Sequence, residues 1–250
     1  MKNRFYEFKN VADNEYSLYV YGEIVSEKYP DLFTGKTNEN DVDIKDFKDT
    51  LAGIPLGAKL NMYVNSVGGE VFATSAMVSM LQRAKKEQGI KIDAYVDGLA
   101  CSCASWLIMV ADEIYIYKNS VLMIHKPLTW TYGNANDLQK DIEVLNKIED
   151  GVIIPIYESK AKSETAVIKE MMNAETWLTA TEIQEHFNVT LIDEAKEVEN
   201  IKSKLFNTYK NTPKEFIQVE KPVENKTEEK PIEVDYSDYE NIIKELKGGK

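Results

Sequence analysis

Ser102 is the residue whose type and surroundings most directly suggest chemistry. It follows an apolar stretch that ends at Cys101 and precedes a second one, so we expect it at a strand-to-helix junction. At a helix N-terminus a hydroxyl lies among free backbone N–H groups, and the helix dipole favours developing negative charge. The N–H of Cys103 could then donate to an oxyanion. The alternative is that Ser102 only caps the helix, because serine is a preferred N-cap residue.

The chain has only two histidines, His125 and His186, and therefore two candidate histidine bases. His125 closes the apolar stretch 121–124 and precedes Lys126-Pro127, and the proline keeps this segment extended. A serine becomes a good nucleophile when a base removes its proton, and imidazole is the usual base near neutral pH. A hydrogen-bonded core histidine is the alternative for His125. His186 has charged neighbours in an expected helix, which favours a surface role.

Two consecutive glycines, Gly68 and Gly69, follow the strand expected to end at Val64. Glycines allow the backbone to approach a ligand closely and to adopt unusual dihedral angles. They could supply an N–H donor for an oxyanion, form an edge that pairs with an extended peptide, or simply make a turn. Neither a Gly-Lys-Ser/Thr ending nor a G-x-G-x-x-G pattern accompanies them, so a phosphate loop is not indicated.

The only two cysteines, Cys101 and Cys103, flank Ser102. A thiol nucleophile is therefore a rival to the serine, although burial as small apolar residues is the more usual role of such cysteines. Two cysteines and two histidines are also too few for a disulfide framework, and a zinc site would need nearly all of them. We expect no metal and no cofactor.

The composition is that of a soluble globular protein. The 250 residues are 43% hydrophobic and 29% charged, and the formal net charge is −12. This acidic balance argues against binding to nucleic acid. No apolar run approaches the ~20 residues needed to cross a bilayer, so we expect no membrane partner and a reducing, cytoplasmic location.

Strand and helix patterns alternate along most of the chain. We expect strands near 16–22, 60–64, 92–96, 114–116 and 121–124, and helices near 44–51, 72–80, 102–111, 135–160, 165–172 and 180–187. Such alternation predicts an α/β fold with a mostly parallel sheet. Sites in these sheets form at the carboxyl ends of strands, which directs attention to the loops 65–69, 97–102 and 125–130.

The composition changes towards the C-terminus. We expect a folded domain over 1–206 and a tail over 207–250, which contains ten acidic and eight basic residues. Low hydrophobicity and mixed charge predict that the tail is disordered. Residues 237–247 combine capping-box spacing with apolar residues at helical spacing, so they could form a short helix, in one interpretation a docking helix for a partner.

Four segments in this order resemble the ClpP family of serine peptidases: residues 64–71, 98–105, 123–127 and 175–180. The resemblance covers about residues 15–195 and is strongest to the ClpP-like head maturation (prohead) proteases of tailed bacteriophages. It implies a ClpP/crotonase-like fold of repeated β-β-α units with a long handle helix at 135–160, which mediates ring stacking. It also implies a homo-oligomeric ring that acts on peptide substrates.

The resemblance assigns roles by position. It implies Ser102 as the nucleophile and His125 as the general base, with an oxyanion hole made by the backbone N–H groups of Gly68 and Cys103. The acid that orients the histidine falls on Glu175, where ClpP itself has aspartate, and Asn173 is the second choice.

An extended substrate would pair with the edge 68–71 and with residues 125–128. Gly69, Val71 and Lys126 are the substrate-binding residues that this placement predicts.

The predicted function is that of an ATP-independent serine endopeptidase that trims scaffold or capsid protein during phage head maturation, in the host cytoplasm or the procapsid. The sequence before the first strand and the insert at 29–43 depart from ClpP, which puts an ATPase partner in doubt. The alternatives are an ATPase-partnered housekeeping peptidase, a non-catalytic assembly module on the same fold, and a crotonase-like acyl-CoA enzyme.

Overall fold

The computed structural model describes residues 10–12, 14–30, 35, 37, 41–197, 201 and 203–214. All of them belong to one compact unit, Met1–Gln218. The second unit, Val219–Lys250, and the helix predicted at 237–247 lie outside the described residues.

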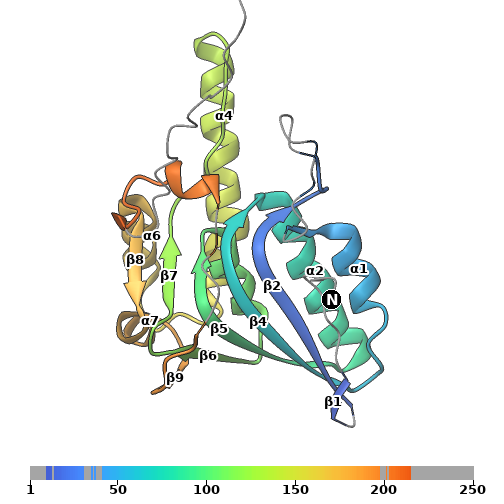
Figure 1. Ribbon diagram of the computed structural model, residues 1–250. Helices are drawn as coiled ribbons and strands as arrows, with labels where there is room; N and C mark the ends of the chain where they lie inside the picture. Colours follow the sequence, from blue (N-terminus) through green and yellow to red (C-terminus); the bar gives the residue numbers. More distant parts are fainter. Residues whose placement is uncertain are drawn as a thin grey trace, which may run out of the picture. The chain divides into compact units, whose positions relative to one another are not determined.

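A mostly parallel sheet forms the centre of this unit, which confirms the predicted fold class (Figure 1). Its strands follow the order β1-β2-β4-β5-β6-β9, in which β2, β4, β5, β6 and β9 run parallel to one another and β1 is antiparallel to β2. The bounds are β1 Asn10–Ala12, β2 Glu15–Val25, β4 Lys59–Gly69, β5 Lys91–Cys101, β6 Glu113–Tyr117 and β9 Thr190–Ile192. The short strand β3 (Val42–Asp43) pairs with β2.

Strand β5 changes partners along its length. Residues 93–96 pair with β6, whereas residues 99–101 pair with β7 (Val121–Ile124). Strand β7 in turn pairs antiparallel with β8 (Thr176–Thr179), a strand that the sequence did not predict. The change of partner brings β7 and β8 alongside the end of β5.

Strands β4 and β5 run further than predicted. The loops expected at 65–69 and 97–101 are strand, because β4 and β5 remain paired there with Ser66 opposite Ala100. The Asn65 side chain accepts a hydrogen bond from the backbone N–H of Leu99 at 3.0 Å and joins the two strands across the register shift. The expectation of a turn at these positions was therefore wrong.

Alternation along the strands separates two sheet faces. On β4 the side chains of Leu60, Met62 and Val64 are fully buried under the helices α1 (Ile44–Leu51) and α2 (Val71–Gln88). The residues between them point to the opposite face, where Tyr63 stacks on Tyr19 with ring centroids 5.0 Å apart. This pattern fixes which face forms the core.

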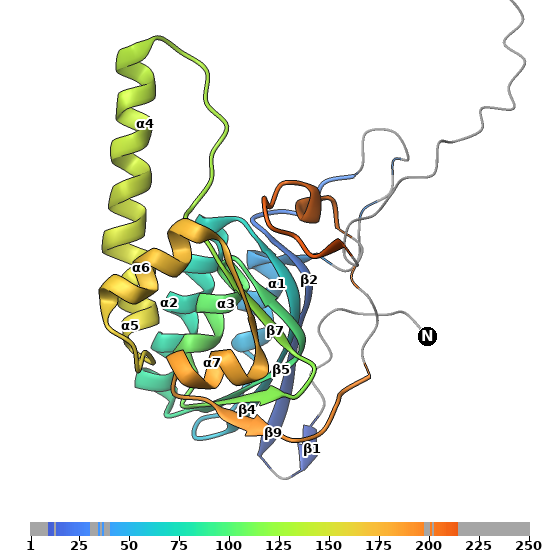
Figure 2. The same cartoon turned by 90° about the vertical axis from the view of Figure 1, so that its left-hand side faces the viewer.

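The long helix predicted at 135–160 is present as three consecutive helical pieces. They are α4 (Ala135–Ile148), the π-helical turn η2 (Glu149–Ile153) and α5 (Ile154–Glu158). None of the α4 residues is buried, and the helix stands away from the sheet (Figures 1 and 2). Pro155, which cannot donate a backbone hydrogen bond, lies just after the π-helical turn.

The remaining helices are α3 (Cys103–Leu107), which continues into the 3-10 helix η1 (Ile108–Val110), α6 (Thr165–Ala174) and α7 (Ala180–His186). In the described part of the chain no helix combines the length and apolar character needed to span a membrane.

Residues 203–214 form a segment that packs on the body. It contains the 3-10 helix η3 (Lys204–Asn207), and its side chains Phe206 and Tyr209 are only 1% and 7% exposed. The predicted boundary at 206 lies within this segment. The packed body thus continues to residue 214, the last described residue.

Candidate active site

Ser102 and His125 meet where two paired strands end. Cys101 lies opposite Met123 in the β5–β7 register, and the Ser102 backbone N–H donates to the Met123 carbonyl at 2.8 Å. The chain then leaves both strands, and His125 Nε2 comes to 2.6 Å from Ser102 Oγ. This is the hydrogen-bonding distance that a serine nucleophile and its base require.

Ser102 does not act as a helix cap. Its side chain makes no capping hydrogen bond to α3, and its backbone has φ +53° and ψ −126°. Residues other than glycine rarely adopt these backbone angles, and such strain is concentrated at functional sites. The geometry directs the hydroxyl to His125 and removes the capping alternative.

Gly68 lies directly against the serine. A Cβ at this position would approach Ser102 Cβ and the Cys101 carbonyl oxygen to 2.6 Å, and Cys103 N to 3.1 Å. Only glycine allows this close approach. The Gly68 N–H donates to Ser66 Oγ at 3.1 Å, whereas Cys103 is the first residue of α3 and has no intrahelical acceptor for its N–H.

Glu175 lies next to the histidine through the β7–β8 register. Ile124 and Thr176 form the last pair of the register, and His125 and Glu175 are the residues immediately beyond it. The charge of Glu175 acts on the His125 ring, which places the two side chains near each other. Glu175 is 7% exposed, whereas Asn173 is exposed on α6. In the described part of the chain the Glu175 carboxylate accepts its hydrogen bonds from the backbone N–H groups of Lys210 at 2.9 Å and Asn211 at 2.6 Å.

Burial lowers the pKa of His125 to about 4, and the nearby charge of Glu175 offsets part of this effect. The ring is therefore neutral at pH 7, which is the protonation state that a general base needs. Tyr209 covers the ring edge-on, with centroids 5.2 Å apart.

This shift predicts a pH dependence of stability. The pKa of His125 in the folded protein lies below its ordinary value of about 6.5. The part of the free energy of unfolding that is linked to this shift is therefore fully present above pH 6.5 and is lost as the pH falls towards 4. We expect His125→Gln to remove this dependence, so that the wild type loses about 2 kcal/mol more than the variant between pH 7 and 4.5. Urea unfolding at both pH values measures the difference, and equal losses would contradict the lowered pKa.

The two cysteines are not suited to be the nucleophile. Both are free and buried, and burial raises the pKa of the Cys101 and Cys103 thiols, that of Cys103 to about 12. A thiol attacks as its thiolate, which burial of this kind disfavours. Among the described residues no group of His, Cys, Asp and Glu side chains could hold a metal ion.

The predicted substrate-binding residues lie around the site with contacts of their own. Gly69 pairs with Ile24 of β2, and Val71 packs against the main core. Lys126 extends from the end of β7 to Glu149, with Nζ 3.1 Å from the carboxylate. His186 is on α7, where its Nδ1 lies 2.8 Å from Ser163 Oγ, so it takes no part in the serine–histidine pair.

Two aromatic residues near the site, Phe206 and Tyr209, were not predicted to have a role there. Tyr209 lies over His125 and contacts Trp177 of β8, with ring centroids 6.4 Å apart. The Tyr209 hydroxyl donates to the Val67 carbonyl at 2.6 Å. The spacing of Phe206 and Tyr209 was the available signal, but both were close to the boundary of a tail predicted to be disordered.

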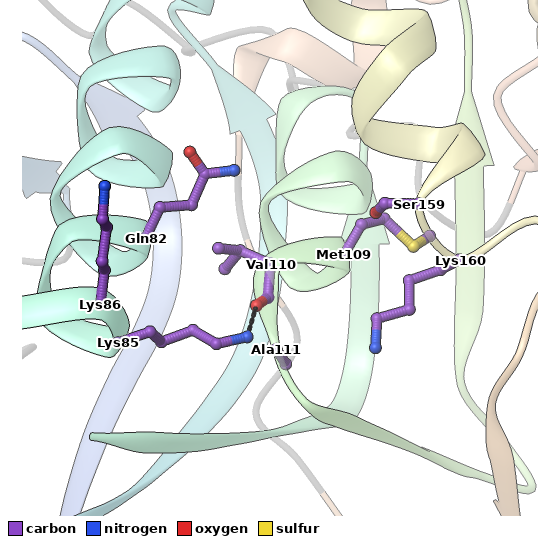
Figure 3. Close-up of a pocket in the computed structure, with 8 residues that line it drawn as sticks. All are labelled: Gln82, Lys85, Lys86, Met109, Val110, Ala111, Ser159 and Lys160. Atoms are coloured by element: carbon purple, nitrogen blue, oxygen red, sulfur yellow. Dashed lines mark hydrogen bonds between the residues drawn. The ribbon is translucent and has the colours of Figure 1, made fainter. Parts of the chain in front are cut away.

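A separate hollow of about 440 Å³ lies between α2, η1 and the end of α5 (Figure 3). Its lining includes Lys85, Lys160 and none of the predicted site residues. Lys85 Nζ donates to the Val110 carbonyl and pairs with Asp112 at 2.7 Å, while Lys160 Nζ donates to the Asp112 carbonyl. Its lysines thus have structural partners, and the hollow contributes nothing to the serine–histidine site.

The structure is an α/β protein in which a serine and a histidine come into hydrogen-bonding contact, an arrangement typical of serine hydrolases. Residues 55–198 match the family model described as Clp protease. The chain belongs to the Clp protease family, whose members are serine-type peptidases.

Among its relatives, an "ATP-dependent Clp protease proteolytic subunit" of Citrus sinensis is 24% identical over 69% of this chain and 87% of its own length. A proteolytic subunit of the same name from Porphyromonas gingivalis (strain ATCC BAA-308 / W83) is 26% identical over 52% of this chain and 57% of its own length.

Proposed function

We propose that this protein is a serine endopeptidase with Ser102 as nucleophile and His125 as general base. The observation that carries the proposal is the 2.6 Å approach of His125 Nε2 to Ser102 Oγ at the ends of two paired strands. Family membership supports the reaction class. The neutral histidine and the protonated, buried thiols support the choice of serine over cysteine.

The proposed reaction is acyl transfer to the serine. His125 takes the hydroxyl proton as Ser102 attacks a peptide carbonyl, and it then protonates the leaving amine. Water, activated by the same histidine, hydrolyses the acyl-enzyme. We assign Cys103 N–H to the oxyanion, because it starts a helix beside the nucleophile. Gly68 N–H is the second proposed donor, and it must first exchange its bond to Ser66 Oγ.

We assign Glu175 as the residue that orients His125. Its position immediately beyond the strand register, as for the histidine, supports this role, as does the exposure of Asn173. Of the three proposed substrate contacts, Lys126 has the most accessible side chain, at 42% exposure, and we propose that Gly69 and Val71 contribute through the shape of the adjoining strand end.

Labelling with a fluorophosphonate probe tests the proposal. We expect the wild-type chain to become labelled at Ser102 during a long incubation, and Ser102→Ala to show none, because the probe forms a bond only with an activated hydroxyl. Cys101→Ser/Cys103→Ser is the matched control and should still be labelled. Labelling that persists in Ser102→Ala and disappears in the cysteine variant would disprove the serine assignment.

We further propose that the substrate is a scaffold or capsid protein processed during phage head maturation, without an ATPase, and that the enzyme assembles as a ring. The motif resemblance and the departures before residue 43 support this biology. The names of the relatives favour a second candidate, an ATP-dependent peptidase. Portal and capsid genes beside this gene would favour the first candidate, and an unfoldase gene would favour the second.

A further inference from the structure

The segment 203–214 covers an apolar surface at the ends of the strands that carry the candidate site. Surface and segment together form a hydrophobic cluster separate from the main core. The surface comes from β4, β5, β7 and β8, namely Val67, Leu99, Cys101, Val121, Met123 and Trp177, and the chain places Ile201, Leu205, Phe206 and Tyr209 against it.

Tyr209 is the residue of the segment that contacts the reacting groups. Its ring covers His125, and its hydroxyl bonds to the Val67 carbonyl and lies within hydrogen-bonding reach of the Ser102 side chain. The Val67 carbonyl is at the end of β4, next to Gly68 and the nucleophile. A substrate backbone or side chain that approached Ser102 across this apolar surface would meet the phenol ring.

The same segment also forms hydrogen bonds with the carboxylate of Glu175. Backbone N–H groups of Lys210 and Asn211 donate to its two oxygens, and the Asn211 side-chain amide donates to the Ala174 and Glu175 carbonyls. No hydrogen bond joins His125 to Glu175 in the described part of the chain, although both lie immediately beyond the last pair of the strand register. Glu175 is thus hydrogen-bonded to the segment and not to His125.

Local contacts preorganise the segment for this position. Ser203 Oγ accepts from the Leu205 N–H at 2.9 Å and donates to the Glu23 carboxylate on β2. Thr212 Oγ1 donates to the Phe206 carbonyl at 2.7 Å and closes the turn around Tyr209. The segment is therefore anchored on both sides of the tyrosine.

We propose that residues 203–214 are an internal inhibitor that covers the apolar surface beside Ser102 with Tyr209 and withholds Glu175 from His125. The inference rests on the proposed peptidase function. Release of the segment would increase the exposure of Ser102, free the apolar surface for an apolar or aromatic substrate side chain, and allow Glu175 to accept the imidazole N–H. Activity would then depend on whatever displaces the segment.

The test compares initial rates of fluorophosphonate labelling in full-length variants. We expect Tyr209→Ala to be labelled at least tenfold faster than the wild type, because the phenol no longer covers His125 beside the serine. Lys204→Ala is the matched control, since this exposed side chain lies in the same segment and should leave the rate unchanged. A peptide of residues 203–214 added to Tyr209→Ala should slow labelling again.

A second pair of variants tests the contact with Glu175 without opening a cavity. Lys210→Pro removes the backbone N–H that donates to the carboxylate, whereas Lys210→Ala keeps it. We expect the proline variant alone to be labelled faster, with both variants remaining folded by circular dichroism.

The outcomes separate the two proposals. If the wild type is labelled at Ser102 as fast as Tyr209→Ala and Lys210→Pro, the inhibitory role is wrong and the peptidase function stands. Slower labelling in these variants would also overturn it, because the segment would then support the site. If neither the wild type nor the folded variants are labelled, the peptidase function fails, and the inhibitory role fails with it.

Discussion

Replacing His125 with alanine is expected to slow fluorophosphonate labelling of Ser102 about a thousandfold. Among the described residues the serine has one partner able to take its proton, at 2.6 Å, and general-base assistance contributes about 10²–10⁴ to such reactions. The neighbouring thiols cannot replace it, because burial keeps them protonated. Labelling rates at pH 7 for wild type and variant give the ratio directly.

The other histidine supplies the control for this experiment. His186→Ala removes the imidazole on α7 that is hydrogen-bonded to Ser163. The labelling rate of this variant should stay within about twofold of the wild type, because substitutions away from the site usually have small effects. A His125→Ala variant that folds and reacts at the wild-type rate would show that the serine is activated by another group.

Gly69→Ala is expected to destabilise the fold by about 3–5 kcal/mol, a large share of the 5–15 kcal/mol typical of a domain. The added Cβ would lie 2.0 Å from the carbonyl oxygen of Ile24 and 2.7 Å from its nitrogen, and both atoms belong to the paired backbone of β2. The backbone at Gly69 also has φ +152°, which side chains rarely adopt. Urea unfolding followed by circular dichroism measures the loss.

Gly57→Ala is the control that distinguishes backbone strain from a steric clash of the added Cβ. Gly57 has φ +70°, but a Cβ there would meet nothing within 4 Å, so only the backbone cost of about 1–2 kcal/mol is expected. If Gly69→Ala and Gly57→Ala unfold at the same urea concentration, the close approach of β4 to β2 does not limit stability.

Much of the fold could be predicted from local patterns. Alternating apolar residues such as Leu60, Met62 and Val64 mark a half-buried strand, and their side chains are indeed buried beneath the helices. Ser102 and His125 were predicted to share one sheet edge because both follow strands, and the structure brings them into contact. Their proximity follows from parallel topology, which the pattern already indicates.

The parts that escaped prediction depend on contacts distant in sequence. The first half of β5 pairs with β6 and its second half with β7, which in turn pairs with β8, and no local signal encodes that change of partner. The packing of Tyr209 is of the same kind, because a mixed-charge stretch is predicted to be disordered unless an apolar surface elsewhere in the fold packs against its few aromatic residues. The contacts of Glu175 with Lys210 and Asn211 follow from that packing.

The left-handed backbone of Ser102 has an evolutionary consequence. At φ +53° a glycine would be more stable than a serine, so drift without selection for chemistry favours its replacement. A lineage that kept this protein only as an inert building block would gain stability by losing the hydroxyl. The proposed role of Ser102 as nucleophile, with His125 in reach, accounts for this cost in stability.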